Sequence, residues 1–441
     1  MDAAEWVARN LTASLLAGTW ARRGLLKRTE AVLGRRTRKA QRVLVDELIE
    51  SATSDYPPSP DWLVALLLRS SAFKQAAGAA IKNPRSVQPV LKHPKFAAAP
   101  RFSHLAVPRL ATLGDLAKWL RLPIEQLDWL ADARRQHGST DIPILQHYRY
   151  AFAPKKTGAP RLIEAPKPRL LAIQRRILHE ILDLLPVHDS AHGFVPGRSC
   201  VSAAQVHAGE NIVVTADLKD FFLNTRLARV HHIFRSLGYP WAVARVLTGL
   251  CSSCTPRSVF SRLPAARRHD WLTQKIYQSP HLPQGAPTSP ALANLAAWRL
   301  DVRVLGLARN FGASYTRYAD DLAFSGDLDF AAKIKSFLAG VEDIARSEGF
   351  VLNTRKTRIM RRAGCQRVTG LVVNDHINVP RSIYDGLKAT LHNCRRHGPV
   401  SENRMGLRDF RAHLNGKVTW VEHVNPVRGQ RLRRMFEEIK W

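Results

Sequence analysis

The sequence predicts an α+β protein, in which helices pack on one face of a sheet and several subdomains share one chain. Three observations predict this fold class. Residues 211–217 form an apolar run typical of a buried strand, whereas the apolar residues within 328–349 recur at helical spacing. Residues 314–325 resemble two short strands joined by a tight turn. At 441 residues the chain exceeds one ordinary core, so we expect about two to four subdomains.

Residues 1–105 predict a basic helical extension. Leucine, alanine and valine alternate there with a run of basic side chains: Arg22, Arg23, Lys27, Arg28, Arg35, Arg36, Arg38, Lys39 and Arg42. Two interpretations stay open at this stage. The run is either a solvated helix face or a surface that contacts RNA.

Residues 113–184 predict a helix pair, a strand–turn–strand unit and a further helix. The helix pair covers 113–120 and 126–130, and the strands cover 148–152 and 161–164. Pro168 favours the start of a helix, since proline suits the first helical turn.

The middle third of the sequence predicts the strands of the sheet, and carboxylates occur where these strands end. The run 211–217 ends in Asp217, and Asp320 and Asp321 occupy the turn of the hairpin. A helix within 328–349 is expected to stop at Gly349. Residues 377–441 predict further basic helices.

The charge of the chain points to a polyanionic partner. Its 67 Lys+Arg against 36 Asp+Glu give a formal net charge of +31. A compact protein with this excess repels itself unless a polyanion neutralises it, so nucleic acid is the expected partner. No apolar run approaches the roughly 20 residues of a membrane span. The five scattered cysteines favour a reducing cytoplasm, and we interpret Cys251 and Cys254 as structural thiols rather than a zinc site.

The three carboxylates are a candidate magnesium site, although an Asp-Asp pair taken alone is more often an ordinary surface turn. Adjacent aspartates at a hairpin tip repel each other, and a divalent cation relieves that repulsion. A third carboxylate at the end of a neighbouring strand completes a set of hard oxygen ligands suited to Mg²⁺. Asp217, Asp320 and Asp321 fit this arrangement. A pair of such ions can activate a hydroxyl and stabilise a leaving pyrophosphate.

Five blocks, in order along the chain, resemble those of reverse transcriptases. They are the fingers residues Lys155, Lys156 and Arg161, the first catalytic strand Asp217–Phe222 (DLKDFF), the pocket loop Leu282–Pro290 (LPQGAPTSP), the catalytic box Tyr318–Asp321 (YADD) and the block Asn353–Lys356 (NTRK). The resemblance implies a right-hand polymerase. We expect the basic extension at 1–105, fingers at 106–210, the palm with its YADD hairpin at 211–376 and a helical thumb at 377–441.

The resemblance also implies roles for single residues. Asp217 and Asp320 would be the main ligands of two Mg²⁺ ions (Mn²⁺ being a substitute), with Asp321 a weaker ligand. The residues implied in nucleotide binding are Lys155, Lys156, Arg161, Phe222, Gln284, Gly285 and Lys356. Of these, Phe222 is either a gate against a ribose 2′-OH or a core residue, and Lys356 is a candidate general acid.

Further residues resemble the retron type within that family. Val368–Gly370 matches its VTG motif, and 192–199 resembles the segment ahead of its catalytic strand. Val368, Thr369 and Gly370 would contact RNA or primer, as would His207 unless it is a structural histidine. Ala203 replaces the asparagine that retron enzymes usually carry, which puts that position's RNA-specific role in doubt.

A retron assignment implies partners that the residues alone do not reveal. These are a cognate non-coding RNA and its branched DNA copy, deoxynucleoside triphosphates, and an effector protein with a part in anti-phage defence. One alternative is a group II intron-like or other bacterial reverse transcriptase, although residues 377–441 leave little room for a maturation region. The alternative from another class is a non-catalytic RNA-binding protein on a polymerase scaffold.

Overall fold

The computed structural model describes residues 2–17, 20–51, 60–87, 94–132, 142–154, 159–264 and 269–441. The chain divides into two compact units. Unit 1 holds residues 1–149, 166–184 and 227–268, and unit 2 holds residues 150–165, 185–226 and 269–441. Among the described helices, none is both long enough and apolar enough to cross a membrane.

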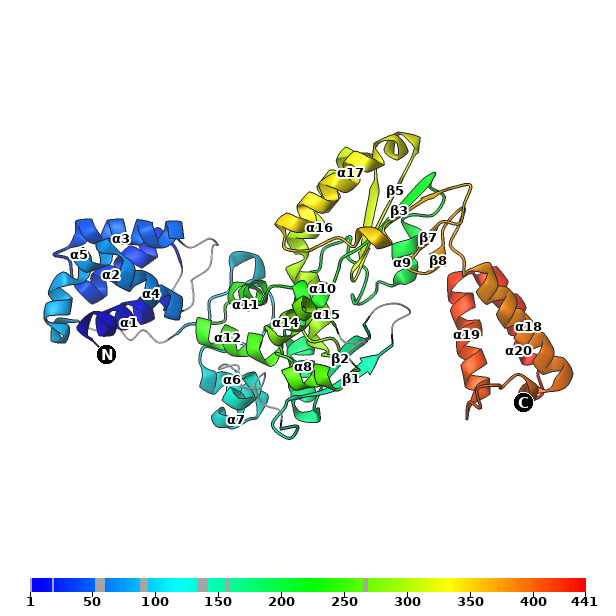
Figure 1. Cartoon of the computed structure of the whole chain (residues 1–441), viewed down its shortest axis with the longest axis horizontal. Coiled ribbons are helices and arrows are strands. Elements are labelled where there is room, and N and C mark those ends of the chain that lie inside the picture. Colours follow the sequence, from blue (N-terminus) through cyan, green and yellow to red (C-terminus); the bar gives the residue numbers. More distant parts are fainter. Residues whose placement is uncertain are drawn as a thin grey trace. The chain divides into compact units, whose positions relative to one another are not determined.

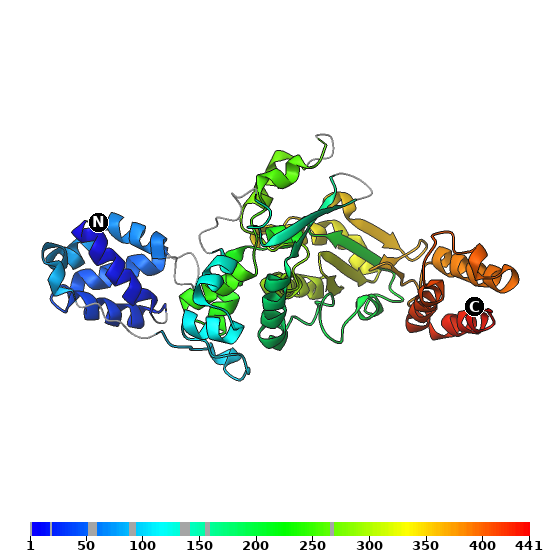
Figure 2. The same cartoon turned by 90° about the horizontal axis from the view of Figure 1, so that it is seen from below.

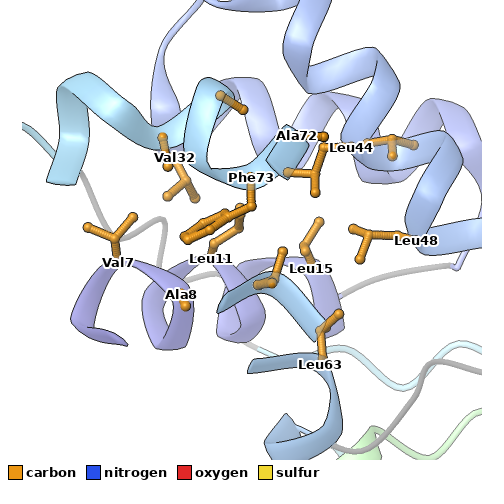
Figure 3. Packing of buried hydrophobic residues seen from close by; sticks show 14 of the residues in the cluster. Val7, Ala8, Leu11, Leu15, Val32, Leu44, Leu48, Leu63, Ala72 and Phe73 are labelled. Carbon is orange, nitrogen blue, oxygen red and sulfur yellow. The ribbon is translucent and has the colours of Figure 1, made fainter. Parts of the chain in front are cut away.

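Unit 1 begins with a five-helix bundle that has its own core (Figure 1 and Figure 2). Its helices are α1 (Ala3–Leu16), α2 (Arg22–Leu33), α3 (Arg38–Ser51), α4 (Pro60–Arg69) and α5 (Ser71–Lys82). Val7, Leu11 and Leu15 recur on one face of α1 and are all fully buried. Figure 3 shows this face packed near Phe73 of α5. The bundle confirms the helices expected within the first 105 residues.

The rest of unit 1 is also helical. It contains η1 (Pro84–Ser86), η2 (Pro100–Phe102), α6 (Leu113–Leu120), α7 (Ile124–Ala131), α8 (Pro168–Glu180), η4 (Leu182–Leu184), α11 (Leu227–Ser236), α12 (Trp241–Leu250) and α13 (Arg257–Ser261). The buried amide of Gln174 on α8 donates to the backbone oxygen of Leu250 at 2.8 Å and to the hydroxyl of Tyr148 at 3.0 Å. These bonds satisfy the amide nitrogen, a donor that would be costly to bury unpaired.

Unit 2 is built around a four-stranded antiparallel sheet of order β4-β5-β3-β6. The strands are β3 (Ile212–Asp217), β4 (Ser314–Tyr318), β5 (Asp321–Gly326) and β6 (Arg358–Arg361). A separate hairpin joins β1 (Tyr148–Ala153) to β2 (Arg161–Pro166), and β7 (Arg367–Val368) pairs with β8 (Leu371–Val372). The buried strand and the hairpin predicted for the middle third are thereby confirmed.

Helices cover both faces of this sheet, although the sequence predicted helices on only one. Figure 1 shows α16 (Trp298–Asn310) and α17 (Leu328–Ser347) on one side of β3 and β5, and α9 (Cys200–Gln205) on the other. On the first face Phe324 packs against Phe337 of α17 at 4.8 Å between ring centres. On the second face Val213 joins a core with Ala204 of α9. The short helix α9 has little helical periodicity of its own, so its place on the sheet was not evident from the sequence.

The remaining elements of unit 2 are short helices near the strand ends and three C-terminal helices. They are α10 (Phe221–Asn224), α14 (Trp271–Gln278), α15 (Thr288–Ala296), η6 (Thr354–Lys356), α18 (Arg381–His397), η7 (Pro399–Ser401), α19 (Phe410–Val424) and α20 (Pro426–Glu437). Leu391, Val418 and Leu432, from the three long C-terminal helices, are fully buried in the core that also contains Val213. The expected C-terminal helices are therefore confirmed.

Replacing Leu11 by alanine is expected to lower the free energy of unfolding of the bundle by about 2–5 kcal/mol, because the truncation leaves a cavity. Val43, which is 56% exposed on α3, supplies a matched control, and Val43→Ala should change this free energy by less than about 0.5 kcal/mol. Urea denaturation followed by circular dichroism measures both. Equal losses in the two variants would contradict the core described above.

Candidate active site

Three carboxylates meet at one end of the sheet. Asp217 is the last residue of β3, and Asp321, the first residue of β5, is its direct partner in the antiparallel register. Asp320 lies in the turn before β5, where its backbone oxygen accepts a 2.9 Å hydrogen bond from the N–H of Leu218. The structure therefore brings together the three aspartates that the sequence singled out.

The turn that carries the aspartates has an unusual backbone. Ala319 has a φ of 57°, a left-handed conformation that costs energy for any residue with a Cβ. A neighbouring segment packs tightly against it, because a Cβ added to Gly193 would lie only 2.6 Å from the backbone nitrogen of Ala319. The N–H of His192 also donates to the backbone oxygen of Arg317 at 2.7 Å. Only glycine at 193 allows this approach.

A buried ion pair lies directly behind the turn. The Arg317 and Asp301 side chains are both fully buried, and their closest nitrogen–oxygen distance is 2.6 Å. Arg317 Nη1 also donates to the side-chain oxygen of Asn294 at 2.8 Å and to the backbone oxygen of Ala319 at 3.0 Å. The guanidinium thus holds the strained residue beside the aspartates. Sequence reasoning missed this network, whose signal was an arginine in the middle of the expected strand SYTRY.

The site concentrates negative charge. Burial raises the pKa of Asp320, and the nearby charge of Asp217 adds to this rise. Partial burial, together with the charges of Asp320 and Asp217, raises the pKa of Asp321 to about 6. Both pKa values are raised, as expected when like charges lie close together in a poorly solvated site.

Lys356 partly neutralises this charge. Its Nζ donates to Asp217 Oδ1 at 2.6 Å, and this hydrogen bond raises the pKa of the lysine. Asn353, just before η6, donates its N–H to the backbone oxygen of Asp217 at 2.7 Å. The block 353–356 was expected near a triphosphate, and the structure places it against the first catalytic strand.

The donor set suits a hard divalent cation in its chemistry. Carboxylate oxygens are the ligands that Mg²⁺ prefers, and the raised pKa values of Asp320 and Asp321 report a repulsion that a cation would relieve. Within the described part of the chain, no group of three His, Cys, Asp or Glu side chains is already arranged around one metal position.

The expected nucleotide-binding loop contacts strand β2. The backbone N–H of Glu164 donates to the backbone oxygen of Gln284 at 2.7 Å. Gly285 has a φ of 132°, and a Cβ there would lie 2.9 Å from the backbone oxygen of Glu164. Arg161, at the start of β2, is exposed to solvent. Lys155 and Lys156, the other expected phosphate ligands, lie outside the described residues.

Phe222 belongs to an aromatic group near the aspartates. It is half-buried on α10, and its ring centre lies 5.8 Å from that of Phe221 and 6.5 Å from that of Phe194. Phe194 is 54% exposed and lies 6.4 Å from Tyr318 of the YADD box. The ring of Phe222 is therefore neither a fully buried core residue nor a free surface residue.

The expected RNA contact of His207 needs correction. Its side chain is fully buried, and its two ring nitrogens lie 2.8 Å from the hydroxyl of Ser325 and 2.7 Å from that of Thr316. Burial lowers its pKa to about 3, so the ring is neutral and connects β4 and β5 of the four-stranded sheet. This geometry fits the structural alternative. Ala203, in the same helical segment, is fully buried as well.

The VTG motif begins with a buried residue, Val368, and ends with an exposed one, Gly370. Val368 is 1% exposed within the core that includes the C-terminal helices, so it is not placed for RNA contact. Thr369 has a φ of 49° and donates its hydroxyl to the backbone oxygen of Cys200 at 2.8 Å, which fixes the turn between β7 and β8. Gly370 follows in the same turn and is exposed.

Arg317→Met is expected to lower the free energy of unfolding by about 3–5 kcal/mol, because it leaves the Asp301 carboxylate buried without its partner. Arg346→Met removes an arginine that is 68% exposed on α17 and should change stability little. Chemical denaturation of both variants checks this. A loss below about 1 kcal/mol for Arg317→Met would contradict the described burial of the pair.

The segment of the chain that matches a known family contains the site. Residues 153–383 match the family of reverse transcriptases (RNA-dependent DNA polymerases). All three aspartates, Lys356 and the pocket loop lie within this match.

Curated relatives are retron reverse transcriptases. Retron Mx65 reverse transcriptase of Myxococcus xanthus is 42% identical over 290 residues, which cover 66% of this chain and 64% of the relative. Retron Mx162 reverse transcriptase of the same organism is 35% identical over 339 residues, covering 74% and 66%. Retron Ec86 reverse transcriptase of Escherichia coli is 32% identical over 341 residues, covering 75% and 90%. The match thus spans slightly less than two thirds of the two Myxococcus proteins. The chain belongs to the reverse transcriptase family, and to the retron type within it.

Proposed function

We propose that this protein is an RNA-directed DNA polymerase that copies a cognate structured RNA into a branched, RNA-linked single-stranded DNA. The observation that carries the proposal is the meeting of Asp217, Asp320 and Asp321 at the end of the palm sheet, within the segment that matches reverse transcriptases. The branched product is what the retron type of the relatives implies.

Asp217 and Asp320 would hold a pair of divalent cations, Mg²⁺ or Mn²⁺, and Asp321 would support them. When bound, such ions increase the acidity of an attacking hydroxyl and neutralise charge on the leaving diphosphate. The register that places Asp217 opposite Asp321 fixes the separation of these carboxylates. The contacts of Arg317 and Gly193 keep the turn between them in place.

Lys356 would act on the phosphates of the incoming nucleotide. Its raised pKa keeps the ammonium protonated at neutral pH. It can therefore neutralise phosphate charge, and it can give up a proton at Nζ only to a strongly basic leaving oxygen. Arg161, with Lys155 and Lys156, would bind the triphosphate, since a guanidinium suits bidentate phosphate contact.

Gln284, Gly285 and Phe222 would form the walls of the nucleotide pocket. Glycine at 285 keeps its part of the wall free of side-chain atoms. The half-buried ring of Phe222 is available to exclude a ribose 2′-OH. Through this exclusion the pocket would select deoxynucleotides.

The partner RNA would be bound mainly through its backbone. A net charge of +31 favours strongly salt-dependent binding, and an A-form duplex offers phosphates and 2′-hydroxyls rather than readable base edges. Thr369 and Gly370, in the turn between β7 and β8, remain candidate RNA contacts. The proposal includes a cytoplasmic location, an effector protein and a part in anti-phage defence, which the retron type implies.

Expression of the gene with its native flanking DNA, followed by analysis of the co-purifying nucleic acid, tests the proposal. The active protein should carry a short DNA linked to RNA through a junction that a 2′–5′ debranching enzyme cuts. Asp320→Asn should reduce this product at least about 100-fold, because loss of a metal ligand removes several kcal/mol of transition-state stabilisation. Asp343→Asn, on the exposed face of α17, is the matched control and should leave the yield unchanged.

Other results of this experiment would overturn the proposal in distinct ways. RNA without DNA in all samples would indicate a binding protein. Unbranched DNA copied from many templates would indicate a reverse transcriptase of another type. An undiminished yield from Asp320→Asn would show that the carboxylates are not the metal ligands.

Phe222→Ala is expected to raise incorporation of ribonucleotides relative to deoxynucleotides by about 10-fold or more. The ring would exclude the 2′-OH sterically, and losing about 1.4 kcal/mol of this discrimination changes the incorporation ratio tenfold. Primer extension with each nucleotide type measures the ratio. Phe311→Ala, which truncates a ring packed on Phe337 of α17, controls for lost aromatic packing and should leave it unchanged. An unchanged ratio in Phe222→Ala would favour the core alternative.

A further inference from the structure

A second buried ion pair connects β2 to the segment just before the expected nucleotide-pocket loop. Glu164 of β2 and His281, just before the pocket loop, are both fully buried, and Glu164 Oε2 lies 2.7 Å from His281 Nε2. The other ring nitrogen, Nδ1, lies 2.7 Å from the backbone oxygen of Ser279. Both histidine nitrogens are therefore engaged, and the pair connects segments 117 residues apart.

Among the described residues, this pair is one of several contacts between β2 and the pocket loop, and two others also involve Glu164. The second is the hydrogen bond from the Glu164 N–H to the Gln284 backbone oxygen. The third is the close approach of Gly285 to the Glu164 backbone oxygen, where a Cβ would meet it at 2.9 Å. All three involve Glu164, so this residue fixes the strand to the loop through both its backbone and its side chain.

The alternation of side chains along β2 relates the Glu164–His281 pair to Arg161, an expected phosphate ligand. Along β2 the exposed Arg161 is followed by buried Leu162, half-buried Ile163 and buried Glu164. Successive side chains of a strand point to opposite faces, so Arg161 lies on the face opposite Glu164. The buried face of β2 is anchored while the other face presents the guanidinium.

The buried charges support each other. Burial by itself would lower the pKa of His281, but the charge of Glu164 and their hydrogen bond outweigh it, and the net pKa is raised. The proximity of Glu164 thus favours the protonated form of the buried imidazole. Removal of either partner would take this contact away from the other buried side chain.

We propose that Glu164 and His281 form a positioning pair that sets the distance between the Arg161 strand and the Gln284–Gly285 loop, and thereby the affinity for the incoming nucleoside triphosphate. Neither side chain touches the nucleotide. They act through Arg161 and the loop, because small displacements of groups that position a substrate cause large losses of rate. This inference rests on the proposed polymerase function.

The kinetic test compares substitutions at Glu164 in the full-length protein. Glu164→Ala removes the tether and is expected to raise the nucleotide KM about 10-fold, with less change in kcat and in template–primer affinity. Glu164→Gln should restore KM to within about twofold, because a neutral His281 whose Nδ1–H donates to Ser279 can accept from the glutamine amide. Glu47→Gln, at a glutamate that accepts from Ser70 in the N-terminal bundle, is the control and should leave KM unchanged.

A double-mutant cycle tests whether Glu164 acts through Arg161. If it does, Arg161→Gln and Glu164→Ala should raise KM by less together than the product of their separate effects. Multiplicative effects would overturn the proposal. So would an unchanged KM in folded Glu164→Ala, or a Glu164→Gln variant as impaired as Glu164→Ala.

Hydrogen exchange supplies a readout that does not need activity. In Glu164→Ala, peptides covering 161–166 and 281–286 should lose protection, whereas β3 should keep its own. The double variant Glu164→Leu/His281→Leu, which leaves no buried charge, should show the same pattern if Glu164→Ala does not fold. Unchanged exchange in both segments would refute the positioning pair. An inactive parent protein with the expected exchange pattern would instead count against the proposed polymerase function.

Discussion

The close approach of like charges at the end of β3 is the constraint on which the rest of the site depends. Asp217 faces Asp321 across the strand pair, and Asp320 lies in the adjoining turn. Repulsion and poor solvation raise the pKa values of Asp320 and Asp321, so the arrangement costs free energy unless cations are present. A backbone that could relax would separate these groups. The sheet register and the tightly packed turn prevent this relaxation.

The compensating positive charge is arranged at increasing distance from the carboxylates. Lys356 contacts Asp217 directly, and the charge of Arg161 lowers the pKa of Asp320 against the effect of burial. Beyond them the whole chain carries a formal excess of +31. An anionic substrate would therefore be attracted over a long range toward carboxylates whose mutual repulsion a divalent ion would relieve.

The sequence predicted the parts of this site that follow local patterns. The β3 run, the hairpin and the aspartates could be recognised because strand spacing and turn residues are local signals. The burial of His207 and Val368 could not be recognised in this way. His207 is enclosed by strands more than 100 residues away in sequence, and Val368 packs with α9 and the C-terminal helices. The ion pairs were missed for the same reason, because Arg317 and Glu164 look like ordinary polar residues until their partners are known.

The two buried ion pairs have the same physical role, which is to orient nearby backbone. A buried pair contributes little stability compared with well-packed apolar residues, so stability alone does not account for either one. Arg317 bonds the backbone of strained Ala319, one residue before Asp320. Glu164 lies three residues after Arg161, and its partner His281, three residues before Gln284, bonds the backbone oxygen of Ser279 through Nδ1. Each pair therefore fixes backbone next to a residue proposed to act on the substrate. An apolar contact could fill the same space, but it would lack the directionality of these hydrogen bonds, and directionality is what a site with mutually repelling charges requires.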